Sequence, residues 1–147
     1  MTFSEEVQGV LHRALVGARE LGHAAITPEH LALEIIREGE TAAYLERYGT
    51  NLVAVESRLR DNLQSVASSR GEEFELKPTP AFQRVLRAAV DRTEGDRREY
   101  VMLRDLFLAL IDDRNTAASA AILDATGEAE AFEELRAYRS PEERGAI

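Results

Sequence analysis

The sequence predicts an all-α protein in which one four-helix unit occurs twice. Apolar residues recur at helical spacing along almost the whole chain, and many of them reappear, identical, 75 positions later. Neither half has enough helices to enclose a core, so we expect the halves to pack as one pseudo-symmetric domain. The matching pairs are Val10 and Val85, Leu11 and Leu86, Ala14 and Ala89, Leu31 and Leu106, Leu33 and Leu108, and Ile36 and Ile111.

Start signals for the first two helices are clear. Thr2 or Ser4 can cap the first helix, and Thr27 followed by Pro28 is typical of a helix start. We expect the second helix to end at Gly39, because glycine often stops a helix. The expected core positions are Val7, Leu11, Ala14, Leu15, Ala18 and Leu21 in the first helix, and Leu31, Ile35 and Ile36 in the second.

The next three helices have similar signals. A third helix should run from Thr41 to Gly49, since glycine adopts the left-handed conformation that ends many helices. Asn51 can cap a fourth helix, and Thr79 with Pro80 repeats the signal of the second. The expected core positions are Ala42, Leu45 and Tyr48 in the third helix, Leu52, Val55, Leu59 and Leu63 in the fourth, and Phe82, Val85, Leu86, Ala89 and Val90 in the fifth.

These signals divide the chain into a domain over 1–138 and a tail. The first repeat covers 1–63 and the second 79–138. The segment 64–78 is polar and lacks helical periodicity, which predicts a connecting loop. We expect the tail, 139–147, to be flexible.

Composition narrows the classes of partner. The chain has 147 residues, with 18 Lys+Arg against 27 Asp+Glu and a formal net charge of -9. Such an acidic chain should not bind nucleic acid or an anionic membrane, so we expect proteins or small ligands as partners. No export signal or membrane span can be recognised, which predicts a cytoplasmic protein.

Signals for catalysis are sparse. Phosphate-binding loops, serine nucleophile elbows and the common zinc motif do not occur in the sequence, and there is no cysteine. We therefore predict no enzyme activity, catalytic residue, metal or cofactor. His12, His23 and His30 have spacings that match no common metal motif, which favours structural roles.

Two charged residues keep two interpretations each. Glu29 either complements the dipole of its own helix or faces a ligand. Arg84 lies between core positions and either is a solvated surface residue or binds a carboxylate of a partner.

Several segments resemble the N-terminal repeat domain of the Clp proteins. In the first half these are Phe3-Ser4-Glu5, Glu20-Leu21-Gly22-His23 and the run from Ile26 to Leu31. In the second half Thr79-Pro80 with Phe82-Gln83-Arg84-Val85-Leu86 is similar to ClpA, and Arg37-Glu38-Gly39-Glu40 is more similar to ClpC. The resemblance covers the chain to about Tyr138 and implies two four-helix repeats, eight helices in all.

The resemblance also implies a function. Such domains recruit adaptors, such as ClpS, or degron-bearing substrates to an ATP-dependent unfoldase, and some ClpC domains bind phosphoarginine. Adaptor-docking positions of ClpA match Glu29, Thr79, Arg84 and His23, and we add Phe82 as a binding residue. The second acid of the phosphoarginine pattern is Arg104 here, so that half of the pocket should fail.

Two questions stay open at this stage. The chain is either an N-terminal piece of a Clp ATPase or a free-standing protein that binds the same partners. The alternative function is a sensor that binds a small molecule or cyclic peptide in the groove between the repeats. Its expected contacts are the aromatic side chains of Phe3, Phe82 and Tyr100.

Overall fold

A computed structural model describes residues 2–66, 76–126 and 131–137 of the chain. Within these ranges eight helices and four two-residue strands follow one another, which confirms the all-α fold class. Helices α1 to α4 belong to the first repeat and α5 to α8 to the second. Their bounds are β1 Thr2–Phe3, α1 Glu5–Glu20, β2 Ala25–Ile26, α2 Pro28–Ile35, α3 Gly39–Arg47, α4 Leu52–Leu63, β3 Lys77–Pro78, α5 Pro80–Gly95, β4 Tyr100–Val101, α6 Leu103–Asp112, α7 Ala117–Ala125 and α8 Ala131–Ala137.

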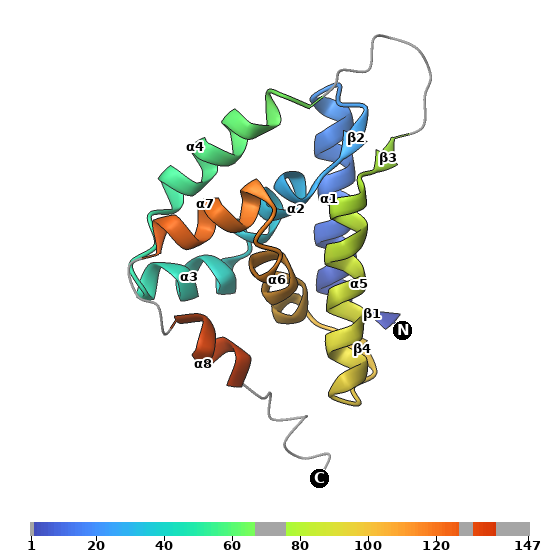
Figure 1. The fold of residues 1–147 in the computed structure, drawn as a ribbon, viewed down its shortest axis with the longest axis vertical. Helices are drawn as coiled ribbons and strands as arrows, with labels where there is room; N and C mark the ends of the chain where they lie inside the picture. Colours follow the sequence, from blue (N-terminus) through green and yellow to red (C-terminus); the bar gives the residue numbers. More distant parts are fainter. Residues whose placement is uncertain (1, 67–75, 127–130, 138–147) are drawn as a thin grey trace.

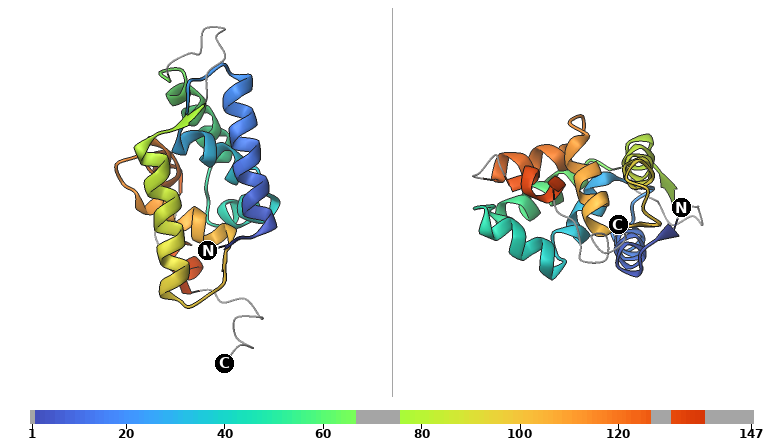
Figure 2. Two further views of the ribbon diagram at one scale, coloured as in Figure 1. Left: turned by 90° about the vertical axis from the view of Figure 1, so that its right-hand side faces the viewer. Right: turned by 90° about the horizontal axis from the view of Figure 1, so that it is seen from below.

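The helices form three tiers (Figure 1). The long first helices of the two repeats, α1 and α5, lie on one side of the molecule, whereas α3, α4 and α7 lie on the other (Figure 2). Helices α2 and α6 occupy the middle, and eight of the ten residues of α6 are buried. The core therefore centres on the second helix of each repeat.

Two short parallel sheets connect the repeats. Strand β1 of the first repeat pairs with β4 of the second, and β3, directly before the second repeat, pairs with β2 of the first. The register places Thr2 opposite Tyr100 and Ala25 opposite Lys77. Each repeat thus gives one strand to the other, which agrees with the expectation that the halves depend on each other.

The predicted helix starts are confirmed in detail. The side chains of Ser4, Thr27, Asn51 and Thr79 each accept a hydrogen bond from a backbone N–H three residues later. For the first helix the cap is Ser4, since Thr2 lies in β1. Each cap satisfies a donor that the helix itself leaves unpaired.

Most of the expected core is buried, including Val7, Val10, Leu31, Ile35, Leu45, Val55, Leu59, Val85, Ala89, Leu106, Leu108 and Ile111. Leu21 was expected in the core, but it is 52% exposed because it follows the last residue of α1 and leaves its apolar face. Gly39 does not end α2: that helix ends at Ile35, and Gly39 is the first residue of α3. Gly49 has a φ of 79° and ends α3 as predicted.

The segment predicted as a loop is only partly described. The last two residues of the predicted loop, Lys77–Pro78, form β3, while 67–75 lie outside the described residues. The tail 139–147 lies outside them as well. In the part of the chain that the structure describes, no helix combines the length and apolar character needed to cross a bilayer.

Candidate functional site

The two sheets divide the predicted site residues into two groups. The backbone N–H of Thr79 donates to the carbonyl of Ile26 at 3.1 Å, which brings the starts of α2 and α5 together beside the β2–β3 sheet. At the other sheet Phe3 lies opposite Val101, next to the pair Thr2 and Tyr100. Glu29 and Thr79 thus belong to one end of the strand exchange and the aromatic pair Phe3 and Tyr100 to the other.

Glu29 connects α2 to the second repeat. Its Oε2 accepts a hydrogen bond of 3.0 Å from the N–H of Ala118, the second residue of α7. A carboxylate at this position complements the positive end of the α7 dipole. Burial raises the pKa of Glu29, and the hydrogen bond from Ala118 acts against that rise. Glu29 therefore does complement a dipole, but in the structure the helix it caps is α7 of the other repeat.

Arg84 reaches the same turn from α5. Its Nε donates to Oδ2 of Asp113 at 3.1 Å, and the Arg84 side chain is 53% exposed. Asp113 lies between α6 and α7, and its carbonyl accepts from the Thr116 hydroxyl at 2.9 Å. The terminal nitrogens of Arg84 form no hydrogen bond within the described residues, so they can bind a carboxylate of a partner.

Together Glu29, Thr79, Arg84 and Asp113 mark what we call the α2–α5–α7 corner, after the helices that these contacts connect. The corner combines a partly buried carboxylate with a half-exposed guanidinium. It is held in place by contacts between the repeats. Its geometry therefore depends on the packing of both halves.

Phe82 does not contribute an exposed ring to this corner. It is 6% exposed and belongs to the core, and only its backbone takes part, donating to the Thr79 hydroxyl at 3.2 Å. Tyr100 is 51% exposed and Phe3 is half-buried. A pocket of about 520 Å³ lies in the first repeat, and none of these three aromatic residues lines it.

His23 and His30 form a pair at the start of α2. Nδ1 of His30 accepts from the Thr27 backbone N–H at 3.0 Å, so its Nε2 carries the proton and donates to Nδ1 of His23 at 2.8 Å. Burial lowers the pKa of His30 to about 4, helped by the nearby His23. Burial also lowers the pKa of His23. Both rings are therefore neutral when they hold the start of α2, and their role is structural.

At the positions equivalent to His23 and His30, the second repeat has other residues, and the sequence analysis did not identify them. Adding 75 to His23 and His30 gives Arg98 and Asp105, and the Asp105 side chain is fully buried. Its carboxylate accepts from Arg98 at 2.5 and 2.7 Å and from the Met102 N–H at 2.9 Å. Burial would raise the pKa of Asp105, but these hydrogen bonds outweigh it and the pKa is lowered.

This pair explains how α6 begins although Met102 stands where the first repeat has a threonine. Asp105 binds the N–H of Met102, just as His30 binds that of Thr27. The 75-residue offset, applied to Thr27 and His30, was the signal that could have found it. Within the described residues, no group of three or more potential ligands is arranged to hold a metal ion.

Comparisons with known proteins agree on one family. The family model described as the Clp repeat (R) N-terminal domain matches residues 2–125. A ClpA homolog protein of Fuscovulum blasticum is 28% identical over 121 residues, 80% of this chain but 15% of that protein. The negative regulator of genetic competence ClpC/MecB of Bacillus subtilis is 29% identical over 119 residues, 80% of this chain and 14% of that protein.

The fold comparison gives the same result. The crystal structure of the Hsp104 N-terminal domain from Candida albicans superposes with a TM-score of 0.79, covers 92% of this chain and 89% of that one, and is 16% identical. At that identity the likeness shows the fold alone. The chain spans about 15% of the length of the curated relatives it matches.

Proposed function

The chain belongs to the Clp repeat N-terminal domain family, and from this premise we propose that it is a non-catalytic domain that recruits protein partners to a Clp ATPase in the cytoplasm. The partners are a ClpS-like adaptor or degron-bearing substrates. ClpA-, ClpC- and ClpB-type relatives each match 80 to 85% of its length. The chain acts either as part of a longer ATPase or as a separate protein.

The α2–α5–α7 corner is the docking surface in this proposal. The observation that carries it is the half-exposed guanidinium of Arg84, which Asp113 holds by Nε while leaving the terminal nitrogens for a partner carboxylate. Neighbouring Glu29 fixes the start of α7, so the surface is rigid before a partner arrives. Preorganisation of this kind lowers the entropic cost of binding.

Calorimetric titration of the full chain tests the proposal. The ligands are a purified ClpS-type adaptor, an N-degron peptide and free phosphoarginine. We expect the adaptor to bind and Arg84→Glu to weaken binding at least about tenfold, since it places a carboxylate against a carboxylate. Arg19→Glu is the matched control, because Arg19 is an exposed arginine of α1, outside the corner. If none of the three ligands binds, the recruiting function is wrong.

A further inference from the structure

The pocket of about 520 Å³ is separate from the docking corner. It opens between α1, α2 and α4 of the first repeat, and Glu29, Thr79 and Arg84 do not line it. Its walls combine small and aliphatic residues with three arginines, one from α1, one from the turn after α2 and one from α4. The lining residues are His12, Arg13, Ala14, Val16, Gly17, Glu20, Leu21, His30, Leu33, Glu34, Arg37 and Arg60.

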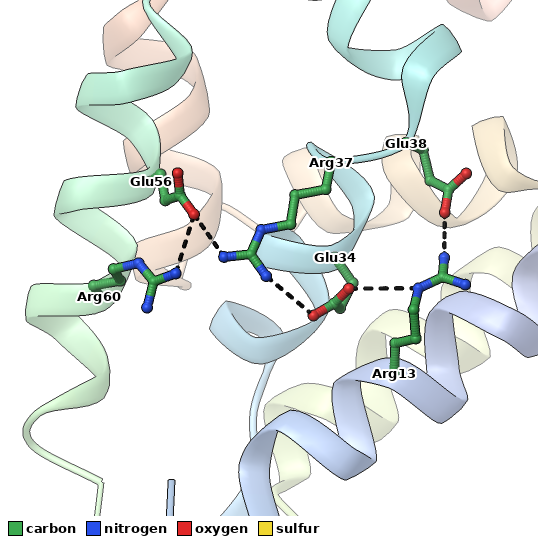
Figure 3. Close-up of polar contacts among 6 residues, drawn as sticks. All are labelled: Arg13, Glu34, Arg37, Glu38, Glu56 and Arg60. Atoms are coloured by element: carbon green, nitrogen blue, oxygen red, sulfur yellow. Dashed lines mark hydrogen bonds and ion pairs between the residues drawn. The ribbon is translucent and has the colours of Figure 1, made fainter. Parts of the chain in front are cut away.

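A row of alternating charges holds the arginines in place, as Figure 3 shows. Arg13 binds Glu38 and lies 3.5 Å from Glu34, which also lies 3.5 Å from Arg37. Arg37 and Arg60 share one oxygen of Glu56, at 2.6 and 3.2 Å. From one end to the other, each residue paired with the next, the row consists of Glu38, Arg13, Glu34, Arg37, Glu56 and Arg60.

The row does not present its charges equally to the pocket. Glu38 and Glu56 hold the guanidinium groups but do not line the pocket. Arg13, Arg37 and Arg60 line it and are 48, 45 and 53% exposed. Two carboxylates share the lining: Glu34, which is 15% exposed, and Glu20, which is exposed at the end of α1. Guanidinium groups therefore outnumber carboxylates in the lining, and their unused N–H donors suit the carboxylate of an occupant.

Gly17 supplies the second observation. It lies in the interior of α1, where glycine costs about 1 kcal/mol relative to alanine. A Cβ added there would meet only Oε1 of Glu34, at 4.0 Å, an ordinary contact. Nothing within the described residues therefore requires a glycine. Gly17 lines the pocket, so its missing side chain leaves space at the α1 backbone for an occupant.

We propose that this pocket binds an acidic peptide segment of a recruited protein, with an aliphatic side chain over Gly17 and a carboxylate on the arginines. Ala14 and Leu33 supply apolar contact beside Gly17. Arg37 and Arg60, already oriented by Glu56, bind the carboxylate. The proposal rests on the recruiting function above and adds to it a second contact point in the first repeat with its own ligand chemistry.

An array of N-acetylated, C-amidated octapeptides tests this with the full chain. Its central positions sample acidic, basic, aliphatic and neutral polar residues, and the strongest binder is then measured by fluorescence anisotropy. We expect that binder to join an acidic to an aliphatic residue. Arg60→Glu and Gly17→Leu should each weaken it at least about tenfold, by charge reversal and by filling the pocket.

Two matched variants control for surface charge and for helix stability. Arg19→Glu changes an exposed arginine of α1 outside the pocket, and Gly95→Ala adds a methyl group at the end of α5, where nothing lies within 4 Å. Both should bind as the unchanged chain does. Gly17→Ala should raise the melting temperature and still weaken the peptide, a combination that a structural glycine would not give.

Other outcomes overturn the proposal. These are absence of binding, a preference for basic or wholly polar peptides, equal effects of the control variants, and self-association of the chain through this pocket in sedimentation experiments. Adaptor binding is measured in parallel. If the adaptor binds and responds to Arg84→Glu while no peptide binds here, only the pocket proposal fails; if neither binds, the recruiting function fails too.

Discussion

Acidification should destabilise the chain through His30. In the folded state Nδ1 of this ring accepts from the Thr27 N–H, and a proton on that nitrogen would abolish the contact. Burial lowers its pKa from 6.5 to about 4. The unfolded chain therefore binds a proton at a higher pH than the folded chain does. The stabilisation is complete above the unfolded pKa and decreases as the pH falls from 6.5 towards 4.

The size of the effect follows from the gap between the two values. One pKa unit corresponds to about 1.4 kcal/mol, so the whole gap is worth about 3 kcal/mol, and the interval from about pH 7 to about pH 5 contains about 2 kcal/mol of it. His30 is only 3% exposed, so solvent screens it little. The test variant is His30→Gln, since glutamine at this helix position can accept the same N–H without titrating.

Urea unfolding followed by circular dichroism at several pH values measures the effect. The unchanged chain should lose about 2 kcal/mol more than His30→Gln on going from about pH 7 to about pH 5. Both proteins keep the other titrating groups, Glu29 among them, so the difference reports on His30 together with its hydrogen-bonded neighbour His23. His12→Gln, at an exposed position of α1, is the control for replacing a histidine. Equal pH dependence of the unchanged chain and His30→Gln would refute the reasoning.

Substitutions at two further positions, each with a matched control, test the polar contacts that join the elements. Asp105→Asn removes the buried carboxylate that binds Arg98 and leaves the contact of Arg98 with Asp96 in place, so it should cost about 3 kcal/mol in urea unfolding. Asp124→Asn, in an exposed pair with Arg58, should cost less than about 1 kcal/mol; similar losses would contradict this. Glu29→Ala should lower the free energy of unfolding by about 1 kcal/mol, because it removes the contact with α7. Glu29→Gln should lower it less, since the amide oxygen still accepts from the Ala118 N–H. Equal melting temperatures of the two variants in thermal unfolding would contradict this.

Local features of the fold could be predicted from the sequence. The caps Ser4, Thr27, Asn51 and Thr79 act on a backbone N–H three residues away, so residue type and spacing decide them. The strand exchange could not, because two-residue strands have no sequence pattern and pairing depends on packing of distant segments. Leu21 shows the same limit at a smaller scale: its spacing fits α1, but the helix ends one residue earlier.

The site was harder to predict than the fold, because its contacts cross between the repeats. The sequence singled out Glu29, but its partner Ala118 is 89 positions away. Arg84 was likewise identified without its partner Asp113. Phe82 was expected both in the core, from its spacing with Val85 and Ala89, and as a binding residue; it lies in the core.

Comparison of the repeats separates what duplication preserves from what it leaves free to change. In both repeats the N–H of the residue just before the second helix donates to a side chain three residues on, His30 or Asp105, and a residue seven positions earlier supports that side chain. The geometry is kept while a neutral pair is exchanged for an ion pair. Only the histidine pair changes protonation between about pH 4 and pH 6.5. Of the two helix starts, that of α2, from which Glu29 reaches α7, is therefore the acid-sensitive one.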